Sequence, residues 1–336
     1  MNDIDIFLSK DDYLYLPTKN NPKVVLTVGN ASLAKNAFRL YNPFSTKAKF
    51  FKYTVEAAFT HFNVIAKRAL ICEKKRKSRF IEELEKKLNV SLVSSVYFAT
   101  AKDKVVLQLQ TPDAQLLGYL KFPLSDIGIE HLLNEKRAID TLSKKSIVQR
   151  YRLFDDFEGR PFLLLEPLDG KIGRVEKEEL TEILKKFHRS ETYALKHHPR
   201  IMAMREEAGR RAPEYLSLLD TICRKSSMKY RLVYEHGDFA PWNIVKVGNE
   251  LIPFDFEYFV EDGLEHFDLI KYYYQIGKLL KAKEGEALYA FVKESMGIVE
   301  FDELFALFLL KEIVRQMREN EDCEFERKLL ERVVER

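Results

Sequence analysis

The sequence predicts an α+β chain in which an antiparallel sheet precedes a mainly helical region. Short apolar runs separated by turn residues fill residues 91–122, which is typical of a strand meander. From residue 176 onward, apolar residues recur mainly at helical spacing. A polar stretch at residues 234–259 interrupts these helices and indicates two strands joined by a tight loop. We therefore expect two lobes of different composition.

Composition and charge narrow the class of protein. The 336 residues are 46% hydrophobic and 32% charged, with a net charge of +3. This nearly balanced charge does not indicate a nucleic-acid-binding protein. The cysteines Cys72, Cys223 and Cys323 lie far apart, so neither a disulfide framework nor a zinc site is expected. No secretory signal is evident, and no apolar run reaches the roughly 18 residues of a transmembrane segment. We expect a soluble, cytoplasmic protein.

Residues 1–90 are expected to form an N-terminal extension of short strands and helices. Apolar runs alternate with Asn, Pro and Gly turns over residues 12–42, including a strand candidate at 38–43. Residues 47–70 and 73–88 each predict a helix, and the second carries one apolar stripe on a strongly charged background.

Residues 91–168 are expected to form an antiparallel lobe. Strand candidates occupy 91–100, 104–111 and 115–122. A helix with apolar positions at 129, 132, 133, 139 and 142 follows, and then a buried strand within 162–170. Residues 169–336 are expected to form the helical lobe, which carries the polar hairpin.

The stretch H-G-D-F-A-P-W-N-I at residues 236–244 carries the strongest chemical signal. Asp238 and Asn243 flank a loop containing proline, and Asp255 follows 12 residues after Asn243 in a second apolar run. Phosphoryl transfer needs a group that orients the acceptor hydroxyl, a cation on the phosphates and a metal held by oxygen ligands. Carboxylate and amide oxygens suit Mg²⁺. Lys121 and Glu135 could supply the cation and its partner.

This stretch resembles the aminoglycoside phosphotransferase and choline kinase superfamily, whose fold is protein-kinase-like. The loop is similar to the family's H-x-D-x-x-x-x-N motif, and P-F-D-F-E is similar to its I-D-F-E strand. E-H-F-D-L-I (265–270), E-I-L-K-K-F-H (182–188) and F-L-L-L-E-P-L-D-G (162–170) resemble further family segments in the same order. The resemblance covers roughly residues 91–285.

The resemblance implies a role for individual positions of this chain. Asp238 corresponds to the catalytic Asp that accepts the proton of the acceptor hydroxyl. Asn243 and Asp255 correspond to the Mg²⁺ ligands. Lys121 corresponds to the lysine on the α- and β-phosphates, and Glu135 to its ion-pair partner, with Glu130 as the alternative. The remaining implied positions are Glu166 and Leu168, whose backbone groups would meet the nucleobase, and His236, whose role would be structural.

One segment departs from the family pattern. The loop over the phosphates would be F-A-T-A-K-D-K at residues 98–104, which contains no glycine. Backbone amides could still approach the phosphates there because Ala and Thr are small. Three further residues leave alternatives open. Trp242 could pack the loop or stack on an acceptor sugar, and Glu257 could be a second metal or charge partner or could brace the hairpin. His188, expected on a helix, is interpreted as a core or interlobe residue rather than a catalytic one.

The resemblance implies a Mg²⁺-dependent kinase that transfers the γ-phosphate of ATP or GTP to a hydroxyl of a small molecule. The P-W-N form of the loop resembles members linked to polysaccharide genes, so a sugar or glycoconjugate is the first choice of acceptor. Choline or another amino alcohol comes next, and an aminoglycoside third. The rival reading is a pseudokinase or scaffold, whereas a protein kinase is disfavoured because D-F-G and A-P-E segments are missing.

Overall fold

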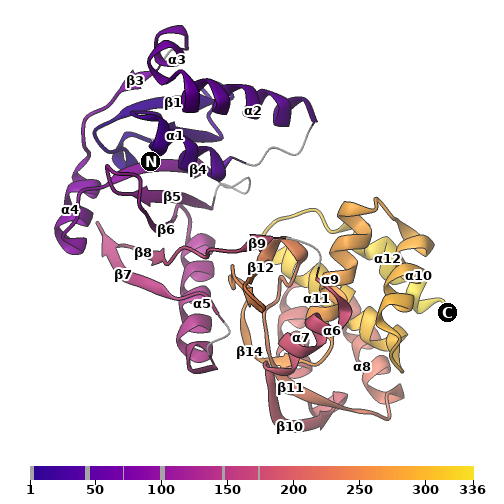
Figure 1. Cartoon of the computed structure of the whole chain (residues 1–336). Helices are drawn as coiled ribbons and strands as arrows, with labels where there is room; N and C mark the ends of the chain where they lie inside the picture. Colours follow the sequence, from indigo (N-terminus) through magenta and orange to yellow (C-terminus); the bar gives the residue numbers. More distant parts are fainter. Residues whose placement is uncertain (1–3, 42–45, 71, 99–102, 146–147, 173–174) are drawn as a thin grey trace. The chain divides into compact units, whose positions relative to one another are not determined.

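The computed structural model describes residues 4–41, 46–70, 72–98, 103–145, 148–172 and 175–336 (Figure 1). The chain divides into two compact units. Unit 1 comprises Met1–Leu132 and Arg150–Pro167, and unit 2 comprises Leu133–Gln149 and Leu168–Arg336. The helix α5 (Asp126–Leu142) begins in unit 1 and ends in unit 2.

Over the described part of unit 1, eight strands form one antiparallel sheet in the order β3-β1-β2-β4-β5-β6-β8-β7. The predicted meander is confirmed, because β4, β5 and β6 pair in sequence order. The strands are β1 (Asp12–Leu16), β2 (Val24–Thr27), β3 (Glu73–Lys74), β4 (Val93–Phe98), β5 (Lys104–Gln110), β6 (Leu116–Pro123), β7 (Tyr151–Phe157) and β8 (Arg160–Leu165).

Helices cover both faces of the N-terminal strands. Successive side chains of a strand point to opposite faces, and in β1 this separates Tyr13 from Leu14. Tyr13 belongs to a core with Phe80 and Leu84 of α4 (Arg79–Leu88), whereas Leu14 belongs to a second core with Phe59 of α2 (Thr46–His61). The helices of unit 1, besides the start of α5, are α1 (Ala31–Ala37), α2 (Thr46–His61), α3 (Asn63–Ala69) and α4 (Arg79–Leu88).

Residues 1–90 share their sheet with residues 91–168. Val24 and Val25 of β2 pair with Tyr97 and Val96 of β4, and all four residues of β2 are buried. A mainly apolar strand that is buried on both faces is typical of an inner place in a sheet, and β2 has strands on both sides. The expected division near residue 90 therefore does not separate two sheets.

Three local expectations in unit 1 were wrong or incomplete. The helix expected at 73–88 begins only at Arg79, and Glu73–Lys74 form β3 instead. A strand was expected at 38–43, but Phe38–Leu40 form a 3-10 turn that continues α1. Residues 42 and 43 lie outside the described part. The Asn30 side chain caps α1 by accepting a hydrogen bond from the Leu33 amide at 2.9 Å, so the chain enters a helix here. The strand β7 was not predicted.

Unit 2 is mainly helical, as expected, and the described residues also form two three-stranded sheets, β10-β11-β14 and β13-β12-β9. Its helices after α5 are α6 (Lys177–Lys185), α7 (Pro199–Arg211), α8 (Leu216–Lys225), α9 (Phe267–Gln275), α10 (Gly285–Met296), α11 (Phe301–Arg318) and α12 (Glu324–Val334). Its strands are β9 (Lys171–Ile172), β10 (His188–Ala194), β11 (Lys229–Glu235), β12 (Ile244–Val247), β13 (Glu250–Pro253) and β14 (Val260–Leu264).

The helix α11 forms the centre of unit 2. Most of its residues are buried, on all sides of the helix, and they pack with apolar residues of α7 to α10, α12, β11 and β14. A helix that is buried on all sides has to lie inside a core. The core thus supports β11, the strand that leads into the polar loop.

His188 is a correction to the predicted helix. The helix α6 ends at Lys185, and His188 is the first residue of β10, where it pairs with Val233 of β11. The following residues include Thr192 and Tyr193, which favour a strand. Among the described residues, no helix is both long and apolar enough to cross a membrane.

Candidate active site

The loop after β11 is fixed by His236, whose side chain is buried. Its Nδ1 atom accepts a hydrogen bond from the Asp238 amide at 3.3 Å. Its Nε2 atom lies 3.0 Å from the Phe254 carbonyl, to which it donates. Burial lowers the pKa of His236, so the ring is neutral. Both ring nitrogens have a hydrogen-bond partner. The structural role implied for this histidine agrees with these contacts.

Asp268, the second residue of α9, holds the same loop from the other side. Its buried carboxylate accepts hydrogen bonds from the His236 amide at 2.7 Å and the Gly237 amide at 3.0 Å. Burial, and next the nearby Glu235 carboxylate, raise the pKa of Asp268 to about 7 despite these two bonds. The E-H-F-D segment (265–268), which leads into α9, therefore fixes the loop that carries Asp238.

Asn243 contacts Asp238 directly. The Asn243 Nδ2 atom donates to the Asp238 carbonyl at 2.9 Å and to the Asp238 Oδ2 atom at 3.0 Å. The asparagine is buried at the end of a 3-10 turn, Pro241–Asn243, where proline fixes the first residue. Because its nitrogen faces Asp238, the Asn243 Oδ1 atom is the branch of the amide that remains for an electrophile such as a metal ion.

The hairpin β12–β13 brings Asp255 next to Asn243. Ile244 pairs with Pro253, and the Phe254 amide donates to the Asn243 carbonyl at 3.0 Å. Asp255 follows at once, in the left-handed conformation with φ 66°. An aspartate in this conformation is uncommon and marks a position with a special backbone requirement. The two backbone segments are therefore adjacent, and the convergence of the Asn243 and Asp255 side chains on one metal ion stays a prediction.

The donor set at Asn243 and Asp255 fits a magnesium ion. It offers one amide oxygen and one carboxylate, which are hard oxygen ligands. Magnesium sites that serve nucleotides commonly take only one or two protein carboxylates, and phosphate oxygens and water complete the shell. Among the described residues, no cluster of three or more His, Cys, Asp and Glu side chains is arranged for a metal.

Lys271 was missed by the sequence analysis. Its buried Nζ atom lies 3.4 Å from Asp238 Oδ1 and 2.8 Å from Glu312 Oε2 of α11. Burial opposes the charge on Lys271, yet the Glu312 and Asp238 carboxylates raise its pKa, so the ammonium stays charged. The available signal was its place one helical turn after Asp268, on the same buried side of α9.

Glu312 belongs to a buried ion cluster behind the loop. Burial disfavours its charge, but the ammonium groups of Lys271 and Lys311 and the Arg315 guanidinium hold the pKa of Glu312 well below its usual value. Lys311 also bonds Glu235 at 3.1 Å, and Arg200 bonds the same carboxylate at 3.1 Å. These pairs border a cavity of about 100 Å³ that Gly237 also lines. The cluster fixes α7, α9 and α11 beneath the loop.

The other predicted positions lie in the expected elements. Lys121 is buried in β6 between Val106 and Leu163, and Glu135 is buried in α5. The Glu166 amide donates to the Arg150 carbonyl at 2.9 Å, just after β8. Glu166, Leu168, Trp242 and Glu257 are half-buried. The pairing of Lys121 with Glu135 and the nucleobase contacts of Glu166 and Leu168 stay predictions. In the loop 98–104, residues 99–102 lie outside the described part.

Comparison with solved structures identifies the fold. The structure of a thermostable aminoglycoside phosphotransferase mutant, in a ternary complex with ADP and hygromycin B, matches with a TM-score of 0.50 at 8% identity, covering 76% of this chain and 96% of that one. This likeness confirms the bilobal, protein-kinase-like fold expected from the sequence. No protein-family model and no curated protein matches the chain.

Two further structures align over much of the chain. An ethanolamine kinase of Plasmodium vivax matches with a TM-score of 0.43 at 14% identity, covering 91% of this chain and 93% of that one. A choline kinase of Cryptosporidium parvum matches with a TM-score of 0.44 at 13% identity, covering 73% of this chain and 88% of that one.

Proposed function

We propose that this protein is a small-molecule kinase that transfers the γ-phosphate of ATP or GTP to a hydroxyl group, with Mg²⁺ as cofactor. The observation that carries the proposal is the contact between Asp238 and Asn243, with Asp255 held beside them by the hairpin. Phosphoryl transfer requires little of the protein beyond positioning and charge stabilisation. This arrangement offers a carboxylate for the acceptor and two oxygen ligands for the metal.

Asp238 would act on the acceptor. Its carboxylate would accept the proton of the hydroxyl as the hydroxyl oxygen forms a bond to the γ-phosphorus. The bond between that phosphorus and the β,γ-bridging oxygen breaks, and the nucleoside diphosphate leaves with the electron pair. Asn243 and Lys271 hold the Asp238 carboxylate from two sides, which limits its rotation before reaction. Mg²⁺, held by Asn243 and Asp255, would neutralise phosphate charge.

The remaining nucleotide contacts are those that the family resemblance implies. Lys121 would contact the α- and β-phosphates, and Glu135 would orient the Lys121 ammonium. Both side chains are buried, which is uncommon for Lys and Glu unless they have partners. Backbone groups at Glu166 and Leu168 would bind the nucleobase. A backbone N–H or C=O group can make these hydrogen bonds whatever the side chain. The protein is proposed to act in the cytoplasm.

A sugar or glycoconjugate is the proposed acceptor, and its support is the P-W-N form of the loop. Trp242 is half-buried beside the metal-ligand candidate Asn243, so part of the indole can meet a ligand. Amino alcohols and aminoglycosides are the alternatives, in that order. Sugars should therefore open the acceptor screen.

Nucleotide binding tests the proposal first. Thermal unfolding should be followed with ATP and with GTP, each with and without Mg²⁺, for the wild type and Asp255→Ala. A ligand at a hundred times its Kd stabilises by about 2.7 kcal/mol, which is several degrees for a chain of this size. We expect a Mg²⁺-dependent shift that Asp255→Ala loses and that the surface control Asp140→Ala keeps.

Turnover then separates a kinase from a scaffold. Nucleoside diphosphate release should be measured with a sugar panel for the wild type and Asp238→Asn. We expect Asp238→Asn to bind the nucleotide normally and to lose most turnover. Full turnover by Asp238→Asn would contradict the role of Asp238. Failure of the wild type to bind either nucleotide would favour a noncatalytic scaffold.

A further inference from the structure

The helices α2 and α3 of unit 1 expose an unusual set of large apolar side chains. Among the described residues, all the exposed Phe, Tyr and Trp side chains lie between residues 50 and 62. Two aliphatic residues follow within three positions. We call these six side chains, each 49% to 74% exposed, the outer patch: Phe50, Phe51, Tyr53, Phe62, Val64 and Ile65.

The outer patch is distinct from the face that holds the helices on the sheet. Val55, Phe59 and Ala66 are buried in the core beneath β1 and β2, and the Phe59 ring lies 6.3 Å from that of Phe38. A surface helix normally has one apolar side. Here α2 and α3, which follow one another in dark violet in Figure 1, carry exposed apolar side chains in addition to these buried ones. Large apolar side chains exposed together in one short segment of the chain are typical of an interaction site.

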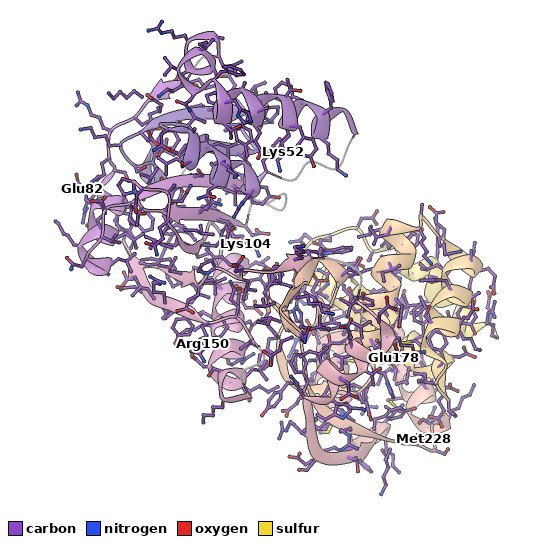
Figure 2. The ribbon with its side chains drawn as sticks, viewed as in Figure 1. Lys52, Glu82, Lys104, Arg150, Glu178 and Met228 are labelled. Atoms are coloured by element: carbon purple, nitrogen blue, oxygen red, sulfur yellow. The ribbon has the colours of Figure 1, made fainter. Side chains whose placement is uncertain are left out.

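The same segment is strongly basic. Residues 46–70 contain five Lys and Arg and a single Glu, a net charge of +4, whereas the whole chain has +3. Lys49 and Arg68 are exposed, and Lys52, labelled in Figure 2, is half-buried on α2. The rest of the chain has a net charge of −1. Within the segment, Lys67 is paired with Asp12 at 3.1 Å, so Lys49 and Arg68 are the exposed basic residues beside the outer patch.

We propose that the outer patch docks on an anionic lipid bilayer, with its aromatic and aliphatic side chains in the interface and its basic residues on the headgroups. Interfacial helices combine exactly these two kinds of residue. A second copy of the chain would oppose one +4 segment to another. Nucleic acid would attract the lysines but would leave Val64 and Ile65 in water. The proposal is independent of the kinase activity.

Vesicle binding tests the proposal with the full chain. Co-sedimentation should compare vesicles of phosphatidylglycerol and phosphatidylcholine with vesicles of phosphatidylcholine alone, at low and high salt. We expect binding to the anionic vesicles that weakens with salt. Each basic residue near the surface contributes about fivefold, so Lys49→Gln should weaken binding by about that factor. Phe50→Ser with Tyr53→Ser should weaken it at least about tenfold, because both rings leave the lipid.

A matched control is available in unit 2. Leu279 and Leu280 are 57% and 64% exposed, so Leu279→Ser with Leu280→Ser removes similar apolar surface elsewhere. We expect this control to bind vesicles as the wild type does, and circular dichroism to show that every variant is folded. The proposal is overturned if the wild type does not bind anionic vesicles at low salt. It is also overturned if the control weakens binding as much as Phe50→Ser with Tyr53→Ser does. It is also overturned if light scattering shows a dimer that Phe50→Ser dissociates.

Discussion

Lys271 Nζ lies 3.4 Å from Asp238 Oδ1 and 2.8 Å from Glu312 Oε2, so a single buried ammonium joins the candidate catalytic carboxylate to the core. The contact connects α9 and α11 to a loop that hydrogen bonds alone would hold less firmly. A buried charge is tolerated only with partners, and Lys271 has two carboxylates. The position of Asp238 thus depends on a residue outside the family-like motif.

Replacing Lys271 should separate its structural from its chemical effect. Lys271→Met leaves the Asp238 and Glu312 carboxylates without their shared cation, which should lower the free energy of unfolding by about 3–5 kcal/mol. Lys271→Arg retains the charge and should lose less stability. We expect both variants to lower kcat more than they change KM for nucleotide, because Asp238 is displaced while the nucleotide contacts remain. Urea unfolding and steady-state kinetics measure these effects.

The exposed Lys225, the last residue of α8, provides the control for this substitution. Lys225→Met should leave both the stability and kcat close to the wild-type values. Wild-type kcat in a folded Lys271→Met variant would show that the contact with Asp238 has no role in catalysis.

Asp268 should make stability depend on pH with a definite sign. Its pKa of about 7 in the folded protein exceeds the ordinary value of 3.8. Between these values the folded state binds the extra proton, so this carboxyl group lowers the free energy of unfolding as the pH rises from about 4 to 7. Asp268→Asn removes that contribution. Urea unfolding at pH 5 and pH 8 should show the wild type losing more stability than the variant over this range.

Asp268→Asn should also weaken the loop at every pH. An amide has one acceptor oxygen where the carboxylate has two, so either the His236 or the Gly237 amide loses its partner, at a cost of about 1–3 kcal/mol. If Asp268→Asn loses as much stability between pH 5 and pH 8 as the wild type does, the pH dependence belongs to another group.

Local spacing explains what the sequence could predict. Asp238 and Asn243 are five residues apart in one loop, and Asp255 returns through a short hairpin, so their proximity follows from the chain itself. The strands β4, β5 and β6 were predictable because they alternate with clear turns. In the same way, Lys121 could be placed on its strand.

Contacts across the fold explain what the sequence could not predict. Lys271 and Glu312 are 41 residues apart on two helices, and only the packing of α9 on α11 brings them together. The strands β10 and β14 were missed because neither has a strong apolar pattern, and each is held mainly by pairing with β11. Tertiary pairing overrides weak local preference in both cases.

The aspartate at position 255 should lower the stability of the fold while its carboxylate supports metal binding. Its left-handed backbone, with φ 66°, costs a residue with a Cβ atom about 1–2 kcal/mol, and glycine avoids most of that cost. Asp255→Gly should therefore be more stable than Asp255→Ala by about 1 kcal/mol. Both variants should lose the Mg²⁺-dependent part of nucleotide binding, because both lack the carboxylate. Thermal unfolding measures the first effect, and calorimetric titration of nucleotide with and without Mg²⁺ measures the second. Equal Mg²⁺ dependence in Asp255→Gly and the wild type would remove Asp255 from the metal site.

Gly237, between His236 and Asp238, should tolerate no side chain. Its φ of +82° is left-handed, and an added Cβ atom would lie 2.4 Å from the Tyr258 carbonyl oxygen and 2.6 Å from the Tyr258 Cβ atom. Gly248 makes a matched control, because its φ of +60° carries similar backbone strain and nothing lies within 4 Å of the added atom.

Gly248→Ala should therefore lose only about 1–2 kcal/mol from its backbone conformation. Gly237→Ala should lose more, since the loop must also move away from Tyr258, and that movement takes Asp238 away from Asn243 and Lys271. We expect turnover to fall in Gly237→Ala and to remain unchanged in Gly248→Ala, with urea unfolding measured on both. Equal losses of stability in the two variants would show that the loop has room to move, and that Asp238 is held by its side-chain contacts alone.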